Sequence, residues 1–418
     1  MHHALCSLTL APLLVLAQPV ERQEGQAVSP ISVSALEFGD DTTLFVADSD
    51  GQRLFAYELP SAEPREPGAY NVADLGGLLA AALETTKETI RVHDLAVRPS
   101  TGEAFVAVSV RGERGYTPAI ARVDRKGTVG LIDLQGAKRS SVGLAAAEQS
   151  DVTFWRDVPA STLSITDIDY HDGSVYVSGL STGEFASKLR RVSFPFEGEM
   201  AQTSIEIYHT AHGQLETRAP IRAMTVAPLG GKPTVIAAYT CTPLVTIPVA
   251  NLEPDAKVSG KTIAELGFGN TPIEVLSFSV YDMQAKEAKR YVMVVNRHMG
   301  ARLMSLTDIE EAHAGAGITE GLTDLGTSRG VPSLTLPMGA VMQAADQDAQ
   351  FLLTVRRDLD SGAIQLVSYR KGSYMRISDY ISEYNFPDFE YADDPVQDIV
   401  RQFQNALKAD EGFEDLVR

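Results

Sequence analysis

Cysteine, tryptophan and long apolar runs are all scarce in this chain. Its 418 residues include two cysteines, Cys6 and Cys241, and one tryptophan. Two cysteines cannot build the disulfide framework that stabilises small secreted domains, so the core must come from apolar packing. No segment approaches twenty consecutive apolar residues, and the sequence therefore predicts no helix that spans a membrane.

Positive charge is scarce as well. The chain has 36 lysines and arginines against 55 aspartates and glutamates, which gives a formal net charge of −19 at pH 7. Such a chain repels polyphosphates, so nucleic acid and anionic membrane surfaces are not expected partners. Small molecules and other proteins remain as candidate partners.

Several motifs of known chemistry are missing. The sequence has no Cys-x-x-Cys-His for haem, no Gly-x-Ser-x-Gly nucleophile elbow, no P-loop and no His-Glu-x-x-His. Asp48-Ser49-Asp50-Gly51 begins like an EF-hand calcium loop, but no glutamate closes it at the required distance. This tetrapeptide predicts a hairpin turn instead.

The chain does contain a strand-turn-strand unit that recurs about every 50 to 75 residues, a period typical of propellers and arrays. Six copies align, each with a first strand, a turn and an apolar returning strand. Five of the turns contain Gly, Asp or Pro, and the fifth copy has a longer polar stretch at 283–290. The six first strands are expected at residues 33–38, 92–97, 165–170, 221–226, 273–278 and 338–343. A third strand with alternating large apolar and polar residues follows each pair.

Six such units predict an all-β fold of six four-stranded antiparallel blades, stacked around an axis to bury both faces of each sheet. The pattern resembles the six-bladed β-propellers of secreted and periplasmic proteins, including the NHL-, YncE- and lactonase-type propellers. The resemblance is architectural and covers residues 30–380, which are expected to form one domain.

Both ends of the chain differ from the repeats. Residues 1–17 carry an apolar run at 4–16 and a cleavage site after Ala17, which predicts a signal peptide and a periplasmic or secreted protein. The start has no Lys or Arg, so a mis-assigned start codon stays open. Residues 18–29 are expected to be a flexible lead-in. Residues 381–418 form an acidic tail with a predicted helix at 394–407, which either docks on the propeller or binds a protein partner.

Two insertions interrupt the repeat. Residues 72–87 place leucines at helical spacing and predict a short helix between the first and second blades. Residues 135–159 contain Trp155 and are expected to form a loop, with a lid over one face as the alternative.

One end of the predicted channel collects reactive side chains. The aligned positions near the start of the six first strands are Ser34, His93, Thr166, Arg222, Glu274 and Gly339. Five candidate metal ligands are expected at the same end: His93, His209, His212, Cys241 and His298. Imidazole and thiolate groups are ligands of copper and zinc, so the pattern predicts a transition-metal site with copper favoured. The alternative is that these histidines are polar loop residues and that Cys241 is a small buried side chain.

Acidic and basic residues near this mouth have two interpretations. Arg222 and Glu274 are candidate catalytic residues, one to hold a carboxylate and the other to act as base or cation ligand. In the alternative, they form an ion pair that closes the channel. Asp94 and Asp167 occupy equivalent positions, which favours a structural role in which each carboxyl is buried between blades and bonded to backbone.

These features predict an exported propeller that binds copper, or a small or anionic ligand, at one channel mouth, with oxidoreductase activity if a redox metal is bound. A calcium-dependent, lactonase-like hydrolase is one alternative, although Glu274 is the only carboxylate among the six mouth residues. A non-catalytic propeller that binds protein or polysaccharide is another, and a quinone-cofactor enzyme is a third. Whether the protein is an enzyme stays open at this point.

Overall fold

The computed structural model describes residues 28–144, 152–155, 157–181, 183, 185–198, 200–240, 243–282, 285–324, 326–380, 383, 386, 388–390, 398 and 411. The predicted signal peptide, most of the lead-in, the helix at 394–407 and Cys241 fall largely or wholly outside these residues. None of the helices in the described part of the chain is long and apolar enough to cross a membrane.

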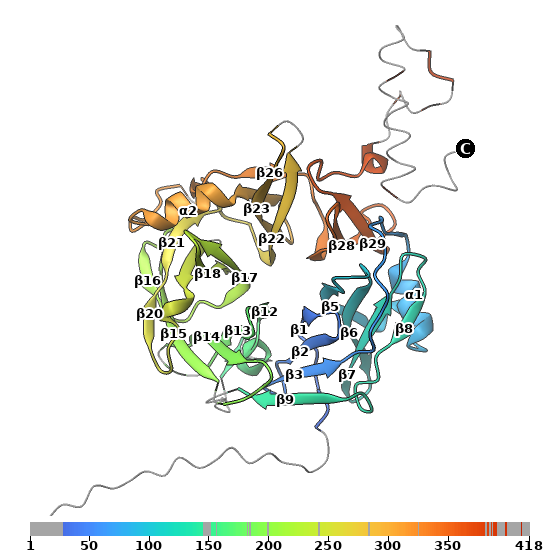
Figure 1. Ribbon diagram of the computed structural model, residues 1–418, viewed down its shortest axis with the longest axis horizontal. Helices are drawn as coiled ribbons and strands as arrows, with labels where there is room; N and C mark the ends of the chain where they lie inside the picture. The colour runs from blue at the N-terminus through green and yellow to red at the C-terminus, as the bar shows by residue number, and fades with distance from the viewer. Residues whose placement is uncertain are drawn as a thin grey trace, which may run out of the picture.

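The described chain contains six sheets of four or more strands and one small two-stranded sheet (Figure 1). The innermost strands of the six sheets are β1 (Ala35–Asp40), β5 (Ile90–Val97), β12 (Asp167–His171), β17 (Ile221–Leu229), β22 (Pro272–Asp282) and β27 (Val341–Asp346). The second strands are β2 (Thr43–Asp48), β6 (Ala104–Gly112), β13 (Ser174–Leu180), β18 (Lys232–Tyr239), β23 (Glu287–Asn296) and β28 (Phe351–Arg357). Each pairs antiparallel with its inner strand, as predicted.

The outer strands complete each sheet. The third strands are β3 (Arg53–Glu58), β7 (Gly115–Val123), β14 (Ser187–Ser193), β19 (Pro243–Pro248), β24 (Ala301–Ser305) and β29 (Ile364–Arg370). The fourth strands are β9 (Arg139–Gly143), β8 (Val129–Leu131), β15 (Ala201–His209), β21 (Lys261–Glu265), β26 (Leu334–Leu336) and β4 (Asn71–Val72). Further short strands are β16 (Gln214–Glu216), β20 (Lys257–Ser259), β25 (Arg329–Gly330), β10 (Thr153–Phe154) and β11 (Val158–Pro159).

The six inner strands contact one another around a ring, which is the arrangement of a β-propeller. Going round, the order is β5, β1, β12, β17, β22, β27 and back to β5. Six apolar clusters fill the spaces between neighbouring sheets, one for each contact in the ring. The core is therefore divided among the sheet-to-sheet interfaces, because each sheet buries both of its faces against its neighbours.

The order around the ring departs from the order in the sequence. The strand β1 lies between β5 and β12, so the first sheet is inserted between the second and the third. After β3 the chain runs to the last sheet, where β4 pairs with β29. It then builds β5–β8 and returns to the first sheet, where β9 pairs with β3. Strand β4 therefore completes the last sheet and β9 completes the first, although each is separated in the sequence from the strand with which it pairs.

Buried polar contacts hold this crossing in place. Tyr70 is fully buried, its N–H donates to Ser368 Oγ at 2.7 Å, and its hydroxyl donates to Gly102 O at 2.9 Å. The side chain of Arg98 is also buried and donates from Nε to Asp41 O at 2.7 Å. Tyr70 thus joins the segment between β3 and β4 to the second and last sheets. Arg98 joins the second sheet to the first.

Two predictions about the insertions need correction. The helix α1 (Leu75–Ala82) forms within 72–87 as expected, but it packs against β29 and β8, on the second and last sheets. It does not lie between the first and second sheets because the ring order is different. Part of the second insertion is β9, a fourth strand of the first sheet, where a loop had been expected. The other α-helix, α2 (Leu306–Ala314), packs on β17, β21, β23 and β24.

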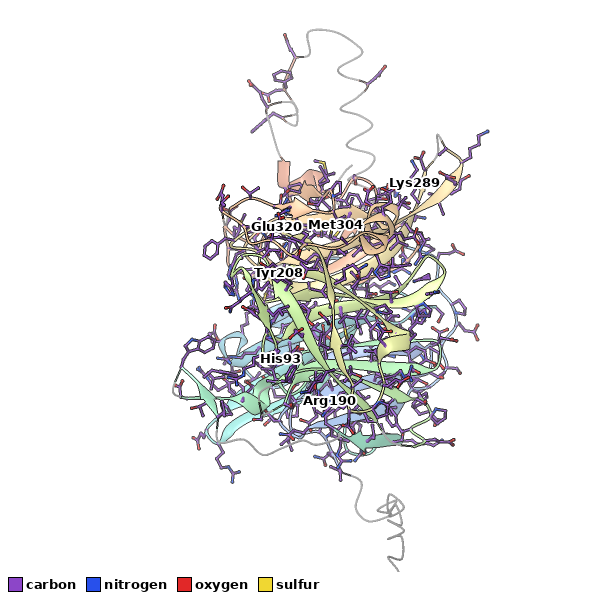
Figure 2. All side chains as sticks on the ribbon, turned by 90° about the vertical axis from the view of Figure 1, so that its left-hand side faces the viewer. His93, Arg190, Tyr208, Lys289, Met304 and Glu320 are labelled. Atoms are coloured by element: carbon purple, nitrogen blue, oxygen red, sulfur yellow. The ribbon has the colours of Figure 1, made fainter. Side chains whose placement is uncertain are left out.

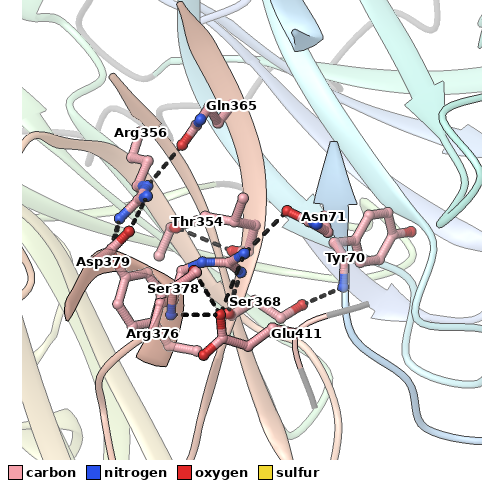
Figure 3. Close-up of polar contacts among 12 residues, drawn as sticks. Tyr70, Asn71, Thr354, Arg356, Gln365, Ser368, Arg376, Ser378, Asp379 and Glu411 are labelled. Carbon is pink, nitrogen blue, oxygen red and sulfur yellow. Dashed lines mark hydrogen bonds and ion pairs between the residues drawn. The ribbon is translucent and has the colours of Figure 1, made fainter. Parts of the chain in front are cut away.

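Polar contacts also fix the segment that follows β29 (Figure 3). Arg356 donates to both carboxylate oxygens of Asp379, at 2.7 and 2.8 Å. The N–H and hydroxyl of Ser378 donate to one oxygen of Glu411, at 3.2 and 2.6 Å. Arg376, which is buried, lies 3.8 Å from the same oxygen. Glu411 is thus bound to the segment that follows the last sheet.

Candidate functional site: a carboxylate-lined channel

A cavity of about 180 Å³ lies at the centre of the ring, and all six inner strands contribute to its wall. Its lining includes the carboxyl groups of Glu37, Asp167, Asp169, Glu274 and Asp346. A sixth carboxyl, that of Asp94, lies close enough to raise the pKa of Glu37 by charge repulsion. Six acidic side chains therefore gather where one mouth carboxylate had been expected.

Strand alternation explains why these groups face the channel. Asp167 and Asp169 are two residues apart on β12 and share one side of the strand, while Ile168 between them is buried in the core. Glu37 on β1 lies in the same way between two core residues, Leu36 and Phe38. The core packing on the other side thus directs these carboxyl groups inward.

Three of the aspartates also connect neighbouring inner strands. The hydrogen bonds are Leu36 N–H to Asp94 Oδ2 at 2.6 Å, Met224 N–H to Asp167 Oδ2 at 2.7 Å, and Val226 N–H to Asp169 Oδ2 at 2.7 Å. Each runs from one sheet to the next in the ring. Asp94 and Asp167 thus have the interblade backbone contacts expected in the structural interpretation. Asp167 Oδ1 also accepts the N–H of Ile168 at 2.8 Å, so both oxygens of that carboxyl group are hydrogen-bonded to backbone.

The carboxyl groups resist ionisation. Burial is the largest cause of a raised pKa for all of them, and it brings the pKa of Asp94 and of Asp169 to about 7. For Glu37, Asp167 and Glu274 burial raises the pKa well above its usual value, and repulsion from neighbouring acidic groups adds to the effect. Near neutral pH this site holds protons unless a cation replaces them.

Few positive charges balance these groups. Lys371 Nζ lies 2.5 Å from Asp346 Oδ1 and neutralises that carboxyl group. Burial lowers the pKa of Arg222, Arg297 lowers it further, and Asp167 raises it, so Arg222 lies within electrostatic range of both. No ion pair joins Arg222 to Glu274 among the described residues.

The positions of Arg222 and Glu274 along their strands are also not equivalent. Pairing shifts by one residue at the start of four inner strands, and the extra residues of these β-bulges are His93, Arg222, Ile273 and Met342. Arg222 is therefore a bulge residue, whereas Glu274 follows a bulge and is equivalent to Asp94. Gly339, expected near the start of the last inner strand, precedes β27 by two residues.

Two of the predicted metal ligands lie apart from any cluster. His93 Nε2 is 2.7 Å from Ser109 Oγ, and its carbonyl accepts a hydrogen bond from Gln343. Burial lowers the pKa of His93, and Arg91 lowers it further, so this ring is neutral at pH 7. His298 is exposed in the loop after β23. Within the described residues, neither belongs to a group of three metal-binding side chains.

His209 and His212 do come together, with Glu216, on the hairpin of β15 and β16 at the outer edge of a sheet. In the side view of Figure 2, Tyr208, which precedes His209, is labelled left of the centre of the molecule, and Lys289 is labelled at its upper right. Glu216 was not predicted, although the spacing His-x-x-His-x-x-x-Glu in the sequence could have identified it. Glu37 and Asp169 were missed as well, although their alternation with core residues was visible.

Comparison with known proteins identifies no family. No family model matches the chain, and no curated protein is detectably similar to it. Solved structures that resemble it include the extracellular domains of Drosophila Semaphorin 1b, at TM-score 0.36 and 10% identity over 82% of this chain and 88% of that one. Kuenenia stuttgartiensis hydrazine synthase gives TM-score 0.35 and 12% identity, over 85% and 100%. Similarities this low do not assign a function.

Proposed function

We propose that this protein is an exported six-bladed β-propeller whose central channel binds a divalent cation, with calcium the preferred ion. The observation that carries the proposal is the set of acidic side chains around one cavity of about 180 Å³. Export rests on the apolar run and cleavage site in residues 1–17. The number of blades rests on the six sheets and the ring of contacts between their inner strands.

The chemistry of the lining favours calcium over copper. Calcium binds six to eight oxygen ligands, supplied by carboxylates, carbonyls and water. Glu37, Asp167, Asp169 and Glu274 supply carboxylate oxygens from three different inner strands, and the residues that line the described cavity include no histidine or cysteine. Copper prefers imidazole and sulfur ligands. A bound cation would also relieve the repulsion that raises the pKa of these groups.

A calcium ion in this channel would polarise a carbonyl oxygen, which is the chemistry of a lactonase-like hydrolase. In that reaction class Glu274 would act as a ligand or general base, and Arg222 at the adjacent bulge would hold an anionic group of the substrate. These are the roles that the sequence predicts for the two residues. The same cavity in a non-catalytic propeller would bind a cation or a cationic group without turnover.

The proposal is tested by calcium titration of the metal-free protein, with isothermal calorimetry and thermal melting in parallel. Calcium at 100 times its dissociation constant should stabilise the fold by about 2.7 kcal/mol, which is lost on chelation. Glu37→Gln should weaken binding about tenfold or more, because it replaces a charged ligand by a neutral one of the same shape. Glu113→Gln, on an exposed turn, is the matched control.

Two results would contradict the proposal. One is the absence of calcium binding at millimolar concentration, and the other is equal binding by wild type and Glu37→Gln. Hydrolysis of aliphatic and aromatic lactones with and without calcium then separates the enzyme from the binding protein. Cell fractionation checks export independently, since the mature protein should begin near Gln18.

A further inference from the structure

The hairpin of β15 and β16 carries a second cluster of ligand-forming side chains, outside the residues that line the channel. His209 is the last residue of β15, Glu216 is the last residue of β16, and His212 lies in the turn between them. One ligand atom of each side chain lies within 4.8 Å of the other two. Three ligands thus come from eight consecutive residues.

The three side chains already point at one another. Nδ1 of His209 is 2.8 Å from Glu216 Oε2, and Nδ1 of His212 is 2.5 Å from Glu216 Oε1. The two imidazole rings are 4.0 Å apart between centroids, at an angle of 41°. The three donor groups therefore already lie close enough together to reach one ion.

His209 is almost wholly buried and uses one ring nitrogen, Nδ1, to contact Glu216. The residue is 1% exposed, and no described residue hydrogen-bonds its Nε2, which is itself buried. A buried imidazole nitrogen without a partner is uncommon because it loses hydration without replacement. The ring of His209 is therefore fixed by burial, and its Nδ1 faces Glu216.

The turn is held rigidly by its neighbours. Thr262 Oγ1 donates to Tyr208 O at 2.6 Å, and Leu322 N–H donates to Thr210 O at 2.9 Å. Gly213 has φ of 64°, and a Cβ on Gly321 would lie 3.2 Å from its Cα. Contacts from two other segments thus fix the backbone that carries the ligands, so a metal ion would meet a preorganised site.

We propose that His209, His212 and Glu216 bind a divalent transition-metal ion, independently of the cation site in the channel. Two imidazoles and one carboxylate form the donor set of many zinc sites, with one position left for water or another ligand. Copper(II) should bind more tightly than zinc, because affinities of nitrogen and oxygen sites rise towards copper in the divalent series. The ion would replace the two hydrogen bonds that Glu216 now accepts.

The test uses the full chain without an affinity tag, with His2→Ala and His3→Ala introduced throughout so that the amino terminus does not compete. Copper and zinc are titrated separately into apo protein by calorimetry, and copper-loaded protein is examined by electron paramagnetic resonance. We expect one ion per chain and hyperfine coupling to two imidazole nitrogens. His212→Ala and Glu216→Gln should each weaken binding at least about tenfold, since each removes one of three ligands.

His298→Ala is the matched control, since it removes another exposed histidine that is not in the cluster. His212 is 49% exposed, so its replacement should leave the thermal midpoint of the apo protein unchanged. Glu216→Gln checks the same point without changing the size of the side chain. Equal affinity in wild type, His212→Ala and Glu216→Gln would overturn the proposal, as would a loss of binding in His298→Ala or Cys241→Ala alone. Failure of calcium binding in the channel would leave it unaffected.

Discussion

The raised pKa of Asp94 makes a quantitative prediction about stability. The residue is 8% exposed, and burial raises the pKa of its carboxyl group from 3.8 to about 7. The folded protein therefore binds this proton more tightly than the unfolded chain. Stability from this source is fully present below pH 4 and is lost as the pH rises through 7. Asp94→Asn removes the titration but keeps an oxygen that can accept the N–H of Leu36.

The magnitude follows from the size of the shift. At pH 5 the folded carboxyl is protonated and the unfolded one is ionised, and at pH 8 both are ionised. Two pH units below the folded pKa, at about 1.4 kcal/mol each, give about 3 kcal/mol. The free energy of unfolding of Asp94→Asn minus that of wild type should therefore be about 3 kcal/mol larger at pH 8 than at pH 5, so the variant gains stability relative to wild type as the pH rises.

The assay is urea unfolding followed by far-ultraviolet circular dichroism, at pH 5 and pH 8, with a chelator present to keep the channel free of cations. Asp360→Asn, an exposed residue in the turn after β28, is the control and should differ from wild type by no more than about 0.5 kcal/mol at either pH. A difference between Asp94→Asn and wild type that does not change with pH would refute the reasoning, as would a loss of stability at pH 8 only.

Three further changes test the packing. Tyr70→Phe removes the hydroxyl that accepts the first N–H of β6 at 3.1 Å, and urea unfolding should show a loss of about 1–3 kcal/mol; no loss would mean that water replaces the hydroxyl. Gly179→Ala places a Cβ 2.0 Å from the backbone oxygen of Ser164, so the thermal midpoint should fall, at a cost of about 1–3 kcal/mol. Glu411→Ala removes the acceptor for Ser378, so hydrogen exchange at that amide should become faster, and unchanged exchange would contradict the contact.

Much of the strand pattern was legible in the sequence because it depends on local chemistry. Residues 92–97 lie within β5 and residues 221–226 within β17, since each run alternates or concentrates apolar side chains between turn residues. The last inner strand begins three residues later than expected, at Val341. Ala340 has φ of 54°, a left-handed conformation that interrupts the extended backbone just before that strand.

The two candidate sites differ in how far the sequence could predict them. The neighbouring positions of His209 and His212 follow from a short turn, so the sequence could indicate that pair. The channel could not be derived in this way, because Glu37, Asp94 and Glu274 come from strands far apart in the sequence. Their mutual repulsion depends on which sheets are neighbours, and the predicted order of sheets differed from the observed one.

By itself the sequence determined the antiparallel pairs, the turns and the side of each strand that faces the core, because alternation and turn chemistry act over a few residues. Tertiary structure alone decided that β4 completes the last sheet and β9 the first, since these pairings join segments separated by up to about 300 residues. It also decided that acidic side chains from several strands share one cavity. Such convergence is set by the closure of the ring, which no local pattern encodes.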